Sequence, residues 1–149
     1  MPPTKRNLEG CSMRNILIDL NIIMDFFFNR PGHEKAAEVF GLCAEGGLKG
    51  HVCAHEITTL SYFLGKSVKD KTKIRESLSW VMGAFKVIEV NAVILGRALH
   101  SEIDDFEDAV IEASAREIGA DCIVTRDMGD FRKSSVRATT PEDLLAKKA

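Results

Sequence analysis

The chain has 149 residues, of which 45% are hydrophobic and 28% charged, and its formal net charge is −2. These values are typical of one soluble globular domain and argue against a disordered, collagen-like or coiled-coil protein. The longest apolar stretch, Ile22 to Phe28, is interrupted by Asp25 and is far shorter than the roughly 20 residues of a membrane-spanning helix. Residues 1–14 lack the apolar centre of a secretory signal, so we expect a cytoplasmic protein with no membrane association.

The first dozen residues differ in composition from the rest. Residues 1–12 (MPPTKRNLEGCS) are polar and contain two prolines and one glycine, which predicts a flexible leader before a single domain at 13–149. Cys43, Cys53 and Cys122 fall in apolar stretches, and no two of the four cysteines form a CxxC pair. We therefore expect reduced thiols in the core rather than disulfides.

Hydrophobic patterning in the first half predicts short strands that alternate with helices. A buried strand at 14–18 stops at Asp19 and is followed by a helix at 21–28, which Asn29 to Gly32 terminate. The next elements are predicted from spacing alone, as a helix at 33–44, a strand at 49–53, and helices at 54–64 and 68–85.

The second half repeats the alternation. A strand at 86–90 precedes a helix at 91–103 with Asn91 as its cap, and the most regular helix follows at 105–118. Strands are predicted at 122–124 and 136–139, and the closing helix begins at Pro141. Such alternation implies right-handed crossovers, so the expected fold is a three-layer α/β/α sandwich around a parallel sheet of four to five strands.

Acidic residues stand where the predicted strands end. Asp19 follows the first strand, Glu56 lies just after the second, and Asp127 lies three residues after the strand at 122–124. The helix leading into that strand begins with Asp105 and Asp108. Ligands of open α/β sheets bind beyond the carboxyl ends of the strands, so we expect these side chains to meet at one rim.

Each acid taken singly also has a purely structural explanation. Asp19 and Asp105 fit helix N-caps, Glu56 suits the first turn of a helix, and Asp127 suits a turn. The structural explanation is weaker for the acids as a group, because two charges about 5 Å apart at an effective dielectric of about 20 repel by about 3 kcal/mol. A cluster of this kind persists when it binds a cation or keeps a proton, and oxygen ligands favour Mg²⁺ or Mn²⁺.

The ordered set of motifs resembles the PIN-domain ribonucleases. The carrying segments are ILIDLN with Asp25, His55-Glu56, DFEDA at 105–109, and IVTRD at 123–127 followed by Asp130-Phe131. No single segment is specific, but their order and spacing fit from Met13 to the Thr140-Pro141-Glu142 segment.

This resemblance implies a sheet order of 3-2-1-4-5, a Mg²⁺ or Mn²⁺ site, and hydrolysis of RNA phosphodiester bonds. By motif position it implies four catalytic and metal-binding acids, which are Asp19, Glu56, Asp108 and Asp127. Asp105 lies one turn before Asp108 and is a further metal-ligand candidate. Asn21 and Thr125 match the supporting polar positions. Metal ions held by carboxylates can activate water and stabilise the leaving oxygen, so no Ser-His-Asp or Cys-His arrangement is needed.

Basic residues offer contacts to an RNA substrate. Lys69, Lys71 and Lys73 crowd one short segment, and Arg126 lies beside Asp127. We interpret these four as RNA-contact candidates, with a solvated helix face as the alternative for the lysines.

Partners follow from the resemblance alone. PIN-like toxins are commonly dimers capped by an antitoxin segment, which suggests a homodimer and an antitoxin partner here. The apolar surplus Phe26 to Phe28 is explained either by core packing or by such a partner.

The leading hypothesis is therefore a metal-dependent ribonuclease, with the toxin of a toxin–antitoxin pair as one form of it. Three alternatives remain: an RNA-processing nuclease without antitoxin, a catalytically silent PIN-like module that binds RNA or protein, and a phosphotransfer domain with Asp19 as nucleophile. A zinc site at His51, Cys53 and His55 is a weaker interpretation, because no further ligand pair is evident.

Overall fold

A computed structural model describes residues 15–147 of the chain, so the predicted leader at 1–12 lies outside the described residues. Its centre is a five-stranded parallel sheet in the order β3-β2-β1-β4-β5. The strands are β1 Asn15–Ile18, β2 Lys49–Cys53, β3 Lys86–Ile88, β4 Cys122–Val124 and β5 Ala138–Thr139. The predicted fold class and strand order are confirmed.

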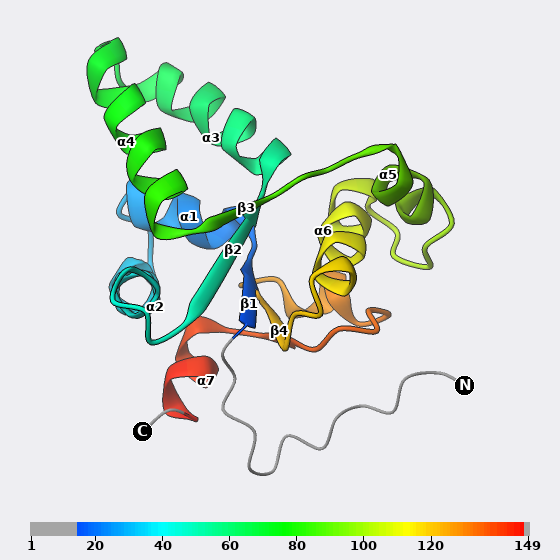
Figure 1. Cartoon of the computed structure of the whole chain (residues 1–149). Coiled ribbons are helices and arrows are strands. Elements are labelled where there is room, and N and C mark those ends of the chain that lie inside the picture. Colours follow the sequence, from blue (N-terminus) through cyan, green and yellow to red (C-terminus); the bar gives the residue numbers. More distant parts are fainter. Residues whose placement is uncertain (1–14, 148–149) are drawn as a thin grey trace.

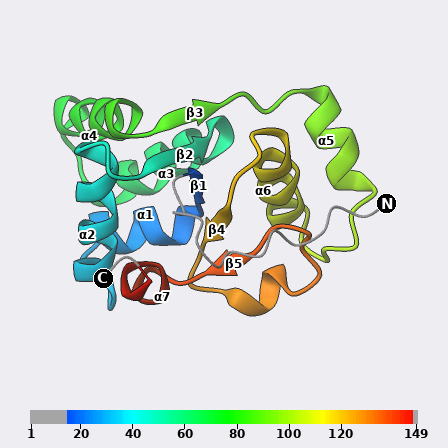
Figure 2. The same cartoon turned by 60° about the horizontal axis from the view of Figure 1, so that its bottom comes forward.

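Helices cover both faces of this sheet, as Figures 1 and 2 show. One face carries α1 Leu20–Phe27, α2 His33–Ala44, α3 Ala54–Ser67, α4 Lys71–Ala84 and α7 Pro141–Ala146. The other carries α5 Ala92–Leu99, α6 Phe106–Glu117 and the short 3₁₀ helix η1 Met128–Phe131. Three layers result, with the sheet in the middle.

The strand residues divide between two apolar cores because successive side chains point to opposite faces. Ile16 and Ile18 of β1 pack in the core beneath α1 to α4, whereas Leu17 packs in the core beneath α5 and α6. Phe26 joins the first core and stacks on Trp80 of α4, with ring centroids 5.4 Å apart. Core packing thus accounts for part of the apolar surplus at the end of α1.

Several predicted boundaries differ from the structure, and a helix cap explains one of the differences. The helix predicted at 68–85 begins at Lys71, because the Asp70 carboxylate accepts hydrogen bonds from the amides of Thr72 and Lys73. The preceding helix runs on to Ser67 instead of ending at Leu64. The helix predicted to reach Ile103 ends at Leu99, where the backbone enters the loop that leads to α6.

The region expected to be a loop after β4 contains the helix η1, which the sequence patterning does not predict. Its single turn is too short to show a helical repeat of apolar residues. Within the described residues 15–147, no helix is long and apolar enough to span a membrane.

Candidate functional site

The carboxyl ends of three adjacent strands place the predicted acids at one rim. β1 lies between β2 and β4, and Asp19, Glu56 and Thr125 follow these strands within a few residues. Parallel pairing aligns the ends, with Leu17 opposite His51 and Ile18 opposite Val124. The rim is therefore built by the strand order itself, and α6 adds its first turn from the side.

Asp19 stands at the centre of this rim and is 9% exposed. It occupies the N-cap position of α1, yet its side chain forms no capping hydrogen bond there. Its Oδ2 instead accepts a hydrogen bond from the Thr125 hydroxyl at 2.8 Å. Burial raises the pKa of Asp19 to about 6, against the opposing effect of Thr125, and the Asp127 charge raises it further. A cap alone does not account for this carboxylate.

Glu56 is completely buried in the first turn of α3. Its Oε1 accepts a hydrogen bond from the Cys53 amide at 3.1 Å, whereas its Oε2 is buried without a hydrogen-bond partner. Burial raises the pKa of Glu56 well above its ordinary value, and the Asp19 charge adds to the shift. Oε1 thus accepts a hydrogen bond at the start of α3, whereas Oε2 is available to bind a proton or a cation.

The first turn of α6 carries Asp105 and Asp108 in different roles. Asp105 is the N-cap, and its Oδ1 accepts a hydrogen bond from the Asp108 amide at 3.0 Å. Burial raises the pKa of Asp108 to about 7, and the negative charges of Asp19 and Asp105 contribute to this increase. The structural explanation therefore holds for Asp105, while Asp108 shares the electrostatic field of Asp19.

Asp127 joins the site through a chain of hydrogen bonds from α1. Asn21 donates from Nδ2 to Asp127 Oδ2 at 3.1 Å and to the Thr125 hydroxyl oxygen at 3.3 Å. The Asp127 amide donates to that same oxygen at 3.1 Å. Thr125 therefore links Asp19 to Asp127, and the two residues expected to support the acids contact them directly.

Sequence reasoning missed two acids of this rim. Glu107 raises the pKa values of Asp19, Glu56 and Asp108, so its charge lies near all three. Adjacent residues of a regular helix point in different directions, which hid Glu107 beside Asp108. Asp130 also raises the pKa of Asp108, but it stands on η1, the element that patterning did not predict.

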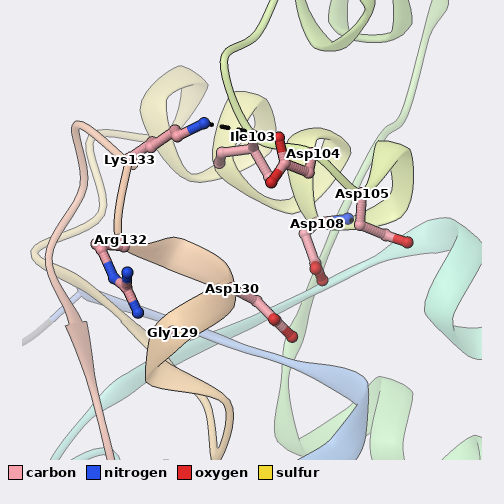
Figure 3. A pocket seen from close by; sticks show the side chains of 8 residues that line it. All are labelled: Ile103, Asp104, Asp105, Asp108, Gly129, Asp130, Arg132 and Lys133. Atoms are coloured by element: carbon pink, nitrogen blue, oxygen red, sulfur yellow. Dashed lines mark hydrogen bonds and ion pairs between the residues drawn. The ribbon is translucent and has the colours of Figure 1, made fainter.

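A pocket of about 320 Å³ opens between α6 and η1. In Figure 3, Asp108 and Asp130 extend toward the same space from these two elements. Arg132 and Lys133 also line the pocket, and Lys133 pairs with Asp104 at 3.6 Å. The acidic rim thus continues into a cavity that carries both signs of charge.

The predicted RNA-contact residues lie in two separate places. Lys69, Lys71 and Lys73 are exposed around the connection between α3 and α4, at the end of the hairpin away from α6 (Figure 1). Arg126 lies at the rim, and its Nη1 donates to Asp25 Oδ1 at 2.6 Å. The structure does not bring the lysines and the acids together.

The acids of the rim differ in how well their arrangement and their chemistry fit a divalent cation. Within residues 15–147, no three or more His, Cys, Asp or Glu side chains are arranged to hold a metal ion. The chemistry of the donors nevertheless fits one, because they are carboxylate oxygens, Glu56 Oε2 lacks a partner, and burial raises the pKa values of Asp19 and Asp108. A bound cation would offset these costs of burial and repulsion.

The structure does not support the weaker interpretation of a zinc site at His51, Cys53 and His55. His51 lies in β2, but the strand ends at Cys53 and His55 belongs to α3, so the three side chains do not alternate along one strand. Cys53 and His51 are both buried in the interior.

Several solved structures have a similar fold, and one of them is described as a toxin–antitoxin complex. VapBC2 from Rickettsia felis, bound to promoter DNA, has a TM-score of 0.67 and 16% identity, over 84% of this chain and 97% of that chain. A toxin–antitoxin complex from Klebsiella pneumoniae has a TM-score of 0.64 and 22% identity, over 85% and 97%. VapC20 from Mycobacterium tuberculosis, described as a sarcin–ricin loop cleaving toxin, has a TM-score of 0.61 and 17% identity, over 82% and 98%.

No curated protein sequence matches the chain. A family model described as PIN domain, however, matches residues 15–129, which run from β1 into η1 and include every acid of the rim except Asp130. This match covers most of the chain. The chain belongs to the PIN domain family.

Proposed function

We propose that this protein is a ribonuclease that uses Mg²⁺ or Mn²⁺ to hydrolyse RNA phosphodiester bonds. The observation that carries the proposal is the grouping of acids from separate elements around Asp19, with Glu56 Oε2 buried and unpartnered. Buried carboxylate oxygens that lack a cation or a hydrogen-bond donor are suited to bind divalent cations. RNA as the substrate is supported by the description of VapC20 as a sarcin–ricin loop cleaving toxin.

The proposed ligands are Asp19, Glu56, Asp108 and Asp127, with Asp105 as the cap that fixes the first turn beneath Asp108. When bound, a divalent ion supplies activation of water and stabilisation of the leaving oxygen. The chain contributes the orientation: Thr125 holds Asp19 Oδ2, and Asn21 holds Asp127 Oδ2. Two supporting residues thereby set the directions of two carboxylates from different strands.

The test is RNA cleavage by the purified full chain with Mn²⁺ or Mg²⁺, and its loss in EDTA. Asp108→Asn should reduce cleavage by at least about a hundredfold, because it removes a ligand without removing the Asp105 cap. Asp104→Asn is the matched control, because that carboxylate lines the same pocket but is 96% exposed and pairs with Lys133. Metal-independent cleavage, or an active Asp108→Asn enzyme, would contradict the proposal, as would equal cleavage of the matching DNA.

We also propose that the protein works as a homodimeric toxin with an antitoxin partner. Support comes from the fold shared with the toxin–antitoxin complex of Klebsiella pneumoniae and from the description of VapC20 as a toxin. The expected result is growth arrest on expression, its relief by co-expression of the adjacent gene, and a dimer mass by light scattering. An RNA-processing nuclease would be harmless on expression and indifferent to the neighbouring gene.

A further inference from the structure

Arg126 lies between Thr125 and Asp127 in the chain, but its side chain points back toward α1. Its Nη1 donates to Asp25 Oδ1 at 2.6 Å. Asp25 belongs to α1, and its side chain is 3% exposed, whereas that of Arg126 is 44% exposed. A carboxylate buried to this extent is expected to keep a charged partner, and Arg126 supplies one through this short, charge-assisted hydrogen bond.

The backbone of the same residue is also tied to α1. The Arg126 amide donates to Asn21 Oδ1 at 3.4 Å, while Nδ2 of Asn21 reaches Thr125 and Asp127. Asn21 and Asp25 lie four residues apart on α1, so they occupy one face of that helix. The segment 125–127 is therefore fastened to α1 at two points, one turn of helix apart.

The attachment of the segment 125–127 to α1 affects the positions of both Asp19 and Asp127. Thr125 donates to Asp19 Oδ2, and the Asp127 amide donates to the Thr125 hydroxyl oxygen. A shift of the segment by about 1 Å would lengthen both hydrogen bonds and change the directions of both carboxylates. Partners that orient metal ligands from behind typically contribute 10–100-fold to affinity or activity.

We infer that Asp25 and Arg126 form a positioning pair that locks the segment 125–127 onto α1 and thereby sets the directions of Asp19 and Asp127. The inference rests on the proposed function for its effect on catalysis. The pair assigns Arg126 a role other than the direct RNA contact expected from its sequence position. Lys can replace the charge of Arg126 but not its planar fork, so Arg126→Lys should restore only part of the effect.

Three readouts separate this role from an RNA contact. Arg126→Gln should weaken Mn²⁺ binding by about tenfold or more and lower kcat, while KM for RNA and its salt dependence stay unchanged. Amide hydrogen exchange at Asp127, measured in EDTA, should become faster in the same variant. Asp25→Asn should reproduce these changes, and the double variant should be no worse than either single variant, because the two residues act as one unit.

Arg30→Gln is the matched control. Arg30 is a second cation close to Asp25, but its guanidinium lies over the Phe28 ring, 5.6 Å from the ring centroid. The Arg30→Gln variant should match the wild type in Mn²⁺ affinity, in the rate of RNA cleavage and in amide hydrogen exchange at Asp127. If Asp25→Asn fails to fold, Arg126→Gln and Arg126→Lys still decide the question, since the Arg126 side chain is half exposed.

An Arg126→Gln protein with wild-type Mn²⁺ affinity and Asp127 exchange would overturn the inference. Additive losses in the double variant, or a raised KM with a flatter salt dependence, would return Arg126 to RNA contact. If the wild type cleaves no RNA, the proposed function fails by itself. Metal binding and hydrogen exchange still report on the positioning pair in that case.

Discussion

Replacing Asp19 by Asn should have opposite effects on the stability of the protein without metal and on its response to metal. Asp19 is 9% exposed, and its pKa is raised from 3.8 to about 6, chiefly by burial. A shift of about two units corresponds to about 3 kcal/mol of preference for the protonated form in the folded state. The charged Asp19 carboxylate therefore lowers the free energy of unfolding. This penalty is fully present above about pH 6 and vanishes below about pH 4.

Asn removes the charge but keeps an oxygen that can accept the Thr125 hydroxyl hydrogen bond. Part of the burial cost remains for a polar amide, so we expect a gain of about 1–3 kcal/mol at pH 7.5 in EDTA. For a domain of this size that gain raises Tm by roughly 3–10 °C. The same change removes the central ligand, so the increase of Tm on adding Mn²⁺ should shrink or vanish.

The assay is thermal unfolding followed by circular dichroism, at pH 7.5 and pH 4, with EDTA and with Mn²⁺. Asp104→Asn is the control for loss of one negative charge at the same pocket, and its 96% exposure predicts little change in any buffer. A stabilised Asp19→Asn variant at pH 7.5 that matches the wild type at pH 4 supports the argument. An Asp19→Asn variant with wild-type melts in both EDTA and Mn²⁺ would refute it, because Asn is itself a good helix cap.

Two other predictions concern protons and salt. Without metal, the pKa values of Asp19 and Asp108 are about 6 and about 7. Protons should therefore compete with Mn²⁺ below neutral pH, and affinity measured by calorimetry should rise more than about tenfold from pH 5.5 to 7.5. A flat profile over this range would exclude these two carboxylates as ligands. Replacing Lys69, Lys71 and Lys73 by Ala should reduce the slope of log K for RNA binding against log salt by about 2. An unchanged slope would make the exposed segment at the α3–α4 connection a solvated surface.

The elements of the fold could be predicted from the sequence because their signals are local. Apolar runs such as Ile16 to Ile18 identify buried strands, and Asn91 and Asp105 cap their helices as predicted. The alternation of strands and helices favours a parallel sheet, because a right-handed crossover needs an intervening helix. The order of the strands came from the resemblance of the motifs, not from the periodicity, and the pairing of β1 with both β2 and β4 confirms it.

The relations between side chains were decided by the tertiary structure. Asp105 could be predicted as a cap from the sequence, and Asp108 as a ligand from its motif position, but only the folded chain brings Asp108 near Asp19. Asp130 enters the rim because α6 and η1 face each other across a pocket. Glu107 enters it because the first turn of α6 lies beside His55 of α3, at 4.0 Å, and no local periodicity encodes either relation.

Arg126 shows the same limit most clearly. Beside Asp127 in the sequence, it has the character of a cation available to a phosphate. In the fold it finds Asp25, 101 positions earlier in the chain, because β1 and β4 are neighbours and α1 begins where β1 ends. Secondary structure depends on neighbours in the chain, whereas a partner for a charge depends on which side chains the sheet brings within about 3 Å.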